Sequence, residues 1–181
     1  MSIMQDLTAY GKFLHEHGLV IGDGGNISAR EGDSFLIKRS GTDMSRGDEA
    51  DYIRLPLSGE ISPEDRAVSS SEVFIHIASY AARGDIYAVA HAHSPYSVAA
   101  SAKIKVLKSP SYEFDCIVGE EAPVIPYIQP GSRELGDSVA EKLSSGANAV
   151  ILKRHGVVAV GKDIREACLR VLAVERACMT L

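Results

Sequence analysis

Three histidines stand at positions from which they could hold one metal ion together. His91 and His93 form an H-A-H pair at the end of an apolar run, residues 86–90, and His155 follows a second apolar run, residues 149–152. Side chains two residues apart on a strand point the same way, so His91 and His93 can share an ion. His155, at another strand end, can supply a third ligand. Three imidazoles with an open fourth position form the ligand set of a catalytic zinc, whereas closed structural sites use four protein ligands. The pattern therefore predicts a metal-dependent enzyme that binds Zn²⁺ or another divalent ion.

A glutamate and three serines stand where a helix is expected to begin. Ser69-Ser70-Ser71-Glu72 precedes a helical pattern that runs to about residue 82. The hydroxyls suit an N-cap, and a carboxylate suits the positive first turn of a helix. Hydroxyls and free N–H groups at a helix start also form an anion site. Glu72 is thus either a first-turn carboxylate that complements the helix dipole or the acid that stands near the open metal position.

Two short loops offer further contacts for an anion. Gly25-Asn26 and Ser40-Gly41 each contain a glycine, which allows a backbone to approach a phosphate closely. Glycine-rich loops are mostly just turns, so each signal is weak alone. The sequence offers no explanation for the acidic side chain of Asp23, beside the first loop.

The remaining histidines compete poorly as metal ligands. His15 and His17 lie on the polar side of an N-terminal helical pattern and are expected to be solvated. His76 follows Glu72 by one helical turn, so it either orients Glu72 or packs as a partly buried histidine.

Length, composition and charge limit the classes of protein. A chain of 181 residues fits one domain, residues 1–181, and is long enough to bury a core. Its 45% hydrophobic and 24% charged content is that of an ordinary soluble protein. The net charge of −5 argues against a nucleic-acid partner. It does not argue against a phosphorylated small molecule, because backbone amides and hydroxyls usually bind phosphate.

Cysteine usage and the N-terminus predict a cytoplasmic protein. Cys116, Cys168 and Cys178 are odd in number and lack CxxC spacing, which favours reduced thiols over disulfides or metal ligands. The N-terminus has neither a basic start nor a long apolar stretch, so no signal peptide is expected. No apolar run approaches the roughly 20 residues of a membrane helix, and no membrane partner is expected.

Helical and strand patterns are intermixed along the chain. Helices are expected over residues 4–17, 69–82, 132–143 and 163–181, with another beginning at Ser94-Pro95. Strands are expected over residues 27–30, 34–38, 52–57, 88–91, 149–152 and 157–160, the first two forming a hairpin. Residues 104–126 are ambiguous. These patterns predict an α/β fold, a single-domain α/β/α sandwich with a mixed central sheet flanked by helices.

A series of short motifs occurs in a recognisable order. They are G-G-N-I-S, a short S-G loop, S-S-E before a helix, H-A-H-S, G-S-R-E-L before a helix, and H-G-V-V-A-V-G. In this order they resemble the class II aldolase/adducin family, in particular its L-fuculose-1-phosphate aldolases, including the short archaeal form. The similarity runs from about Gly18 to the last helix. The resemblance implies a largely antiparallel sheet and a homo-oligomer, most simply a tetramer.

The resemblance also assigns roles to individual residues. His91, His93 and His155 match zinc ligands, and Glu72 matches the catalytic acid/base. The residues that match phosphate-binding groups are Gly25, Asn26, Ser40, Gly41, Ser70 and Ser71. Tyr112 matches a catalytic tyrosine that protonates the aldehyde oxygen from a neighbouring subunit, although a core tyrosine fits the pattern nearly as well.

The implied reaction is the reversible cleavage of a ketose 1-phosphate to dihydroxyacetone phosphate and a short aldehyde such as lactaldehyde. Zinc would act as a Lewis acid on the carbonyl and hydroxyl oxygens, and Glu72 would move the proton. The phosphate would supply remote binding energy that fixes the reacting carbon.

Several alternatives remain open. Pentulose-phosphate 4-epimerases use similar chemistry but usually place Asp where Glu72 stands, whereas methylthioribulose-1-phosphate dehydratases keep a glutamate. A non-catalytic adducin-like scaffold loses the metal ligands that are retained here. A zinc hydrolase fits the histidines but not the phosphate loops, and a lysine Schiff-base aldolase is disfavoured.

Overall fold

One eight-stranded sheet forms the centre of the molecule. The computed structural model describes residues 2–181, and the strand order is β3-β2-β1-β4-β8-β7-β6-β5. The strands are β1 (Asn26–Glu31), β2 (Ser34–Lys38), β3 (Tyr52–Pro56), β4 (Ala88–Ala92), β5 (Val106–Lys108), β6 (Glu121–Ile125), β7 (Ala149–Leu152) and β8 (Gly156–Gly161). All neighbouring pairs among these strands are antiparallel except β6 and β7. The predicted mixed, largely antiparallel sheet is confirmed.

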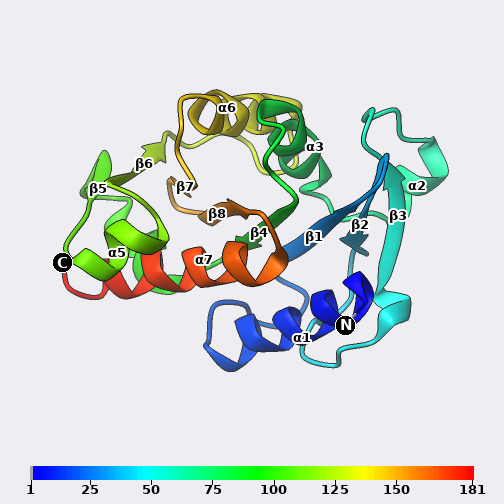
Figure 1. The fold of residues 1–181 in the computed structure, drawn as a ribbon, viewed down its shortest axis with the longest axis horizontal. Helices are drawn as coiled ribbons and strands as arrows, with labels where there is room; N and C mark the ends of the chain where they lie inside the picture. The colour runs from blue at the N-terminus through cyan, green and yellow to red at the C-terminus, as the bar shows by residue number, and fades with distance from the viewer. Residues whose placement is uncertain (1) are drawn as a thin grey trace.

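Helices cover both faces of this sheet (Figure 1). The helices are α1 (Ile3–Glu16), α2 (Pro63–Val68), α3 (Val73–Ala82), α4 (Pro95–Ala100), α5 (Tyr112–Ile117), α6 (Arg133–Ser144) and α7 (Ile164–Cys178), with a 3-10 turn at Glu49–Asp51. Helices α1, α4 and α5 pack against α7 on one face, and α3 packs against α6 on the other. The arrangement is the predicted α/β/α sandwich.

Strand β4 lies in the middle of the sheet and contributes to the core on both faces. Its burial is complete, and successive side chains point to opposite faces. Ala88 and Ala90 belong to the cluster under α1 and α7, whereas Val89 belongs to the cluster under α3 and α6. His91 shares the face of Val89 by this alternation. Its backbone pairs with Asn26 on β1 and with Val158 on β8.

The predicted elements agree with the structure except around residues 60–72 and 104–126. Helix α2 was not predicted, and α3 begins at Val73 instead of within the serine run. The ambiguous stretch contains β5, α5 and β6. Over the part of the chain that the structure describes, no helix has both the length and the apolar character of a membrane span.

Candidate active site

The three predicted histidine ligands converge at one edge of the sheet. His91 is the fourth residue of β4, His93 follows the end of that strand, and His155 lies in the turn between β7 and β8. One ring nitrogen from each lies within 4.8 Å of the others, and the Nε2 atoms of His91 and His93 are 3.2 Å apart. Burial and the neighbouring imidazoles lower the pKa of His91, and burial lowers the pKa of His155 to about 4. Burial also lowers the pKa of His93, so all three rings are neutral near pH 7, as metal binding requires.

A backbone hydrogen bond fixes which nitrogen of His91 can bind a metal. The Nδ1 atom lies 3.0 Å from the carbonyl oxygen of Val157, on the neighbouring strand β8. A carbonyl can only accept, so Nδ1 carries the proton and Nε2 keeps its lone pair. Metal-binding histidines typically have their second nitrogen held in this way.

The backbone around His155 is shaped to bring that ring close to β4. Arg154 adopts a left-handed conformation with φ of 59°, which is strained for a residue with a side chain. Its N–H donates to the hydroxyl of Ser101 at 2.9 Å. Gly156 allows a close approach, since an added Cβ would collide with the carbonyl oxygen of Ala92. The strained backbone at Arg154 and the close approach at Gly156 thus lie on either side of His155, the third predicted ligand.

Glu72 lies at the start of α3 as a buried carboxylate. It is the N-cap residue, yet its side chain makes no capping hydrogen bond. Its Oε2 atom is buried without a hydrogen-bond partner among residues 2–181. Burial raises the pKa of Glu72, while the N–H of Gly131 and the charge of Arg66 oppose that shift. A carboxylate with a raised pKa and an unused oxygen is suited to accept and return a proton.

The serine run has a different role from the predicted helix cap. The hydroxyl of Ser70 accepts a hydrogen bond from the N–H of Glu72 at 3.3 Å, just before the helix begins at Val73. The expectation that Glu72 lies within the first turn is wrong by one position. Because α3 starts later, Ser70 and Ser71 belong to the wall of a pocket.

A single pocket of about 390 Å³ brings most of the predicted residues together, a volume in the range of small-molecule sites. It is lined by Asp23, Gly24, Gly25, Asn26, Lys38, Ser40, Gly41, Ser70, Ser71, Glu72, His93, Pro130 and His155. All the residues predicted to bind phosphate are in this set. They line the same hollow as Glu72 and two of the three histidines.

Lys38 is a pocket residue that sequence reasoning missed. Its side chain is 2% exposed, and its ammonium donates to the carbonyl oxygen of Asp23 at 2.8 Å. Burial lowers the pKa of Lys38, and nearby carboxylates including Asp23 oppose the shift. Lys38 adds a cation to the pocket that the serines and Asn26 line. The signal in the sequence was a lysine at the end of an apolar strand, directly before the Ser40-Gly41 loop.

His76 does not orient Glu72, and that hypothesis is wrong. The imidazole is fully buried and contacts Asn26 at 2.5 Å and Ser28 at 2.7 Å. Through these two contacts the ring of His76 reaches β1, the strand that carries Asn26. His15 and His17 are exposed, as expected.

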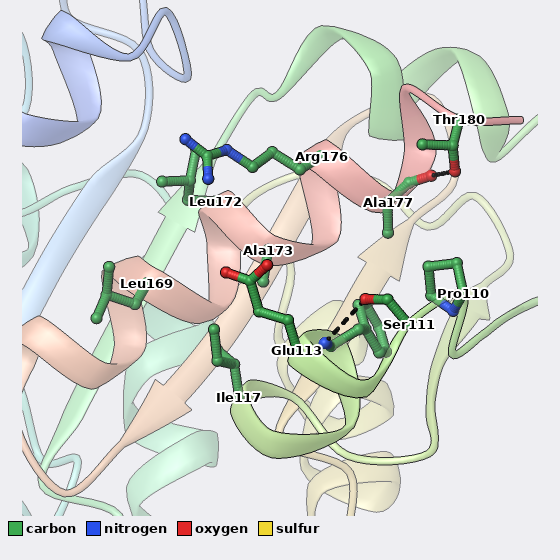
Figure 2. Close-up of a pocket in the computed structure, with 11 residues that line it drawn as sticks. Pro110, Ser111, Glu113, Ile117, Leu169, Leu172, Ala173, Arg176, Ala177 and Thr180 are labelled. Atoms are coloured by element: carbon green, nitrogen blue, oxygen red, sulfur yellow. Dashed lines mark hydrogen bonds between the residues drawn. The ribbon is translucent and has the colours of Figure 1, made fainter.

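Tyr112 lies outside the pocket. It is the first residue of α5, and it is 84% exposed, which excludes the core tyrosine considered above. Its neighbours Ser111 and Glu113 line a separate cavity of about 400 Å³ between α5 and α7 (Figure 2). No residue predicted for the active site lines this second cavity.

The donor set fits a divalent metal ion. Three neutral imidazole nitrogens converge, and the buried Glu72 carboxylate, which lines the same pocket as His93 and His155, lacks a partner for one oxygen within the described chain. Imidazole suits zinc, copper, iron and nickel, and a three-histidine set leaves a coordination position open.

Comparison with known proteins agrees with this geometry. The family model described as Class II Aldolase and Adducin N-terminal domain matches residues 5–181. An L-fuculose phosphate aldolase of Methanococcus maripaludis is 34% identical over 94% of this chain and 92% of its own length. A 5-deoxy-D-ribulose 1-phosphate aldolase of Bacillus thuringiensis is 33% identical over 90% of this chain and 76% of its own.

A solved structure supports the same relationship. The L-fuculose-1-phosphate aldolase from Thermus thermophilus superposes with a TM-score of 0.89 at 29% identity, covering 98% of this chain and 91% of that one. The match over nearly the whole chain includes the loops and strand ends that carry the histidines and Glu72. The chain belongs to the class II aldolase and adducin family, and it is a metal-dependent aldolase, a carbon–carbon lyase.

Proposed function

We propose that the chain is a zinc-dependent aldolase that reversibly cleaves a ketose 1-phosphate of the L-fuculose 1-phosphate type. The products would be dihydroxyacetone phosphate and a short aldehyde such as lactaldehyde. One observation carries the proposal: a single pocket joins neutral histidines, a buried carboxylate with an unpartnered oxygen and a cradle of anion-binding groups. A sugar phosphate needs all three of these parts at once.

In this proposal, His91, His93 and His155 hold the zinc ion. When bound, the ion supplies Lewis acidity to the carbonyl and hydroxyl oxygens of the substrate. The hydrogen bond from His91 to Val157 holds that ligand in the right tautomer before any ion arrives. Such preorganisation lowers the entropy lost when the site forms.

The phosphate end of the substrate is held by backbone and side-chain donors. The residues assigned to it are Gly25, Asn26, Ser40, Gly41, Ser70 and Ser71, which line one wall of the pocket. Lys38 adds a buried positive charge to the same wall. This wall fixes the substrate so that its reacting carbon stands beside Glu72.

Glu72 moves the proton in the proposed reaction. Its unpartnered Oε2 is the acceptor, and its raised pKa brings it closer to the working pH than an exposed glutamate. In synthesis Glu72 accepts a proton from the terminal carbon of dihydroxyacetone phosphate, and in cleavage it returns a proton to that carbon.

The second candidate substrate is 5-deoxyribulose 1-phosphate. The Bacillus thuringiensis relative named for that compound is almost as similar to this chain as the Methanococcus relative. Both substrates would use the same phosphate wall and the same carboxylate and differ only in the aldehyde released.

Assembly and location form a separate part of the proposal. We infer a single catalytic domain over residues 1–181, a cytoplasmic setting and a homotetramer in which Tyr112 enters the site of a neighbour. The exposure of Tyr112 on α5, outside the pocket of its own chain, supports a role across a subunit boundary. In that role Tyr112 protonates the aldehyde oxygen.

Product identity tests the proposal. Zinc-loaded protein is incubated separately with fuculose 1-phosphate, 5-deoxyribulose 1-phosphate, ribulose 5-phosphate and methylthioribulose 1-phosphate. Release of dihydroxyacetone phosphate from either of the first two supports the aldolase and selects its substrate. A C4 epimer from the third compound, loss of water from the fourth, or no turnover of any contradicts it.

A further inference from the structure

A buried chain of hydrogen bonds links the phosphate wall to the interior of α3. Asn26, Ser28, His76 and Tyr80 are each less than 10% exposed. Asn26 Oδ1 lies 2.5 Å from His76 Nε2, and His76 Nδ1 lies 2.7 Å from the hydroxyl of Ser28. That hydroxyl lies 2.7 Å from the phenol of Tyr80. The chain runs from a residue of the pocket into a part of the core that no substrate reaches.

The chemistry of the groups sets the direction of every hydrogen bond in this chain. The amide oxygen of Asn26 can only accept, so His76 must carry its proton on Nε2. Its Nδ1 is then an acceptor and receives the hydroxyl proton of Ser28. The oxygen of Ser28 in turn accepts from Tyr80. The donor and the acceptor of each hydrogen bond in the chain are thus fixed, and the His76 imidazole is neutral.

This direction decides what Asn26 presents to the pocket. With its oxygen engaged by His76, the amide group has its NH₂ donors left for the pocket that Asn26 lines. Reversal of the amide would present an oxygen there, which repels an anion. An amide donor is what a phosphate oxygen requires.

We propose that His76 is a positioning residue that holds the Asn26 amide with its NH₂ toward the substrate phosphate. The inference rests on the proposed function, since it assumes that Asn26 binds the phosphate. Burial supports it, because a buried imidazole stays neutral and keeps one tautomer. His76 itself touches no substrate.

The first test is the tautomer of His76, read from ¹⁵N chemical shifts and long-range ¹H–¹⁵N couplings in the metal-bound protein. A proton on Nε2 is expected. A proton on Nδ1 would overturn the inference, because His76 would then accept from the Asn26 amide. This measurement needs no substrate, so it stands whether or not a sugar phosphate is cleaved.

The second test uses two substitutions that separate the two ring nitrogens. Glutamine places an amide nitrogen near the position of Nε2, so His76→Gln keeps a donor for Asn26. Asparagine is shorter and reaches only toward Ser28, so His76→Asn loses that donor. For His76→Asn, the KM for the sugar phosphate and the Kd for inorganic phosphate, measured by ³¹P NMR titration, are expected to rise about tenfold.

The split between kinetic constants distinguishes positioning from general damage. In His76→Asn, kcat and zinc content should change less than KM, and His76→Gln should restore KM to within about twofold of the wild type. Ser79→Ala is the matched control, because Ser79 is a buried hydroxyl on the same helix that bonds only to Ile75 in the described chain. Its KM should equal that of the wild type.

A double-mutant cycle completes the test. If His76 acts through Asn26, His76→Asn should add little to KM in an Asn26→Ala background. An equal rise in both backgrounds would overturn the inference. A wild-type protein that cleaves no sugar phosphate and binds no inorganic phosphate would instead refute the proposed function, while the tautomer would still decide the orientation of Asn26.

Discussion

Acid should destabilise this fold through His76, because the imidazole is buried where a charge has no partner. The side chain is fully buried, and burial lowers the pKa of His76 from 6.5 to about 3. Below pH 6.5 the unfolded chain therefore binds a proton that the folded chain does not. The stabilisation is fully present above pH 6.5 and is lost progressively as the pH falls toward 3.

The size of the effect follows from the shift. One pKa unit corresponds to about 1.36 kcal/mol, so the free energy of unfolding should fall by about 2 kcal/mol between pH 7 and pH 5 from this residue alone. Domains of this kind have a total stability of roughly 5–15 kcal/mol. The loss is thus large enough to shift a urea midpoint clearly.

The effect is measured by urea unfolding of the metal-free wild type and of metal-free His76→Gln at pH 7, 6 and 5. The free energy of unfolding is compared between the two proteins at each pH. Without metal, the pH dependence of metal binding no longer affects the free energy of unfolding. The other histidines contribute equally to the pH dependence of both proteins. The variant should start less stable at pH 7 and lose about 2 kcal/mol less than the wild type by pH 5. His15→Gln, which replaces an exposed histidine, should follow the wild type. Parallel pH curves for wild type and His76→Gln would refute the reasoning.

Three further predictions concern the active site. Glu72→Gln should keep its zinc and lose about 10²–10⁴-fold in turnover, measured with the exchange of the dihydroxyacetone phosphate C3 proton in deuterated water; near-normal exchange would assign the proton to another group. His91→Ala should lose bound metal and activity together, as measured by elemental analysis, and an active metal-free variant would contradict the ligand assignment. Gly156→Ala should cost about 1–3 kcal/mol in unfolding free energy and weaken metal binding, because the added Cβ would meet the Ala92 carbonyl. Gly84→Ala is its control, since nothing lies within 4 Å of that Cβ, and equal stability of the two variants would count against the steric argument.

The sequence predicted the cluster of three histidines because much of its geometry is local. Alternation along a strand places His91 and His93 on one side regardless of the rest of the fold. The apolar run before His155 identified a second strand end, and the antiparallel pairing of β8 with β4 places the β7–β8 turn that carries His155 beside the end of β4. The side of a strand on which a residue lies depends on only a few neighbouring residues, so the folded chain keeps the arrangement that the sequence predicts.

Features that depend on distant partners could not be predicted in this way. Lys38 resembles a solvent-facing strand residue, because buried lysines are rare unless paired, and its partner lies in a loop before β1. For His76 the sequence left two alternatives, a partner of Glu72 on its own helix or a packing histidine, and neither alternative contained its contact with Asn26, fifty residues earlier. The start of α3 was placed too early because serines favour N-caps in general.

The pairing of Asn26 with His91 across β1 and β4 has a consequence for how substrates are selected. Paired residues in an antiparallel ladder have Cα atoms about 4.5–5.5 Å apart, held by backbone hydrogen bonds. Under the proposed function, the separation between the phosphate end and the reacting carbon would therefore be set by the main chain of two central strands, which tolerates little variation. The pairing of β1 with β4 does not constrain the part of the sugar beyond that carbon. If the proposed function is correct, such a sheet would require the same three-carbon phosphate fragment while the aldehyde released could differ.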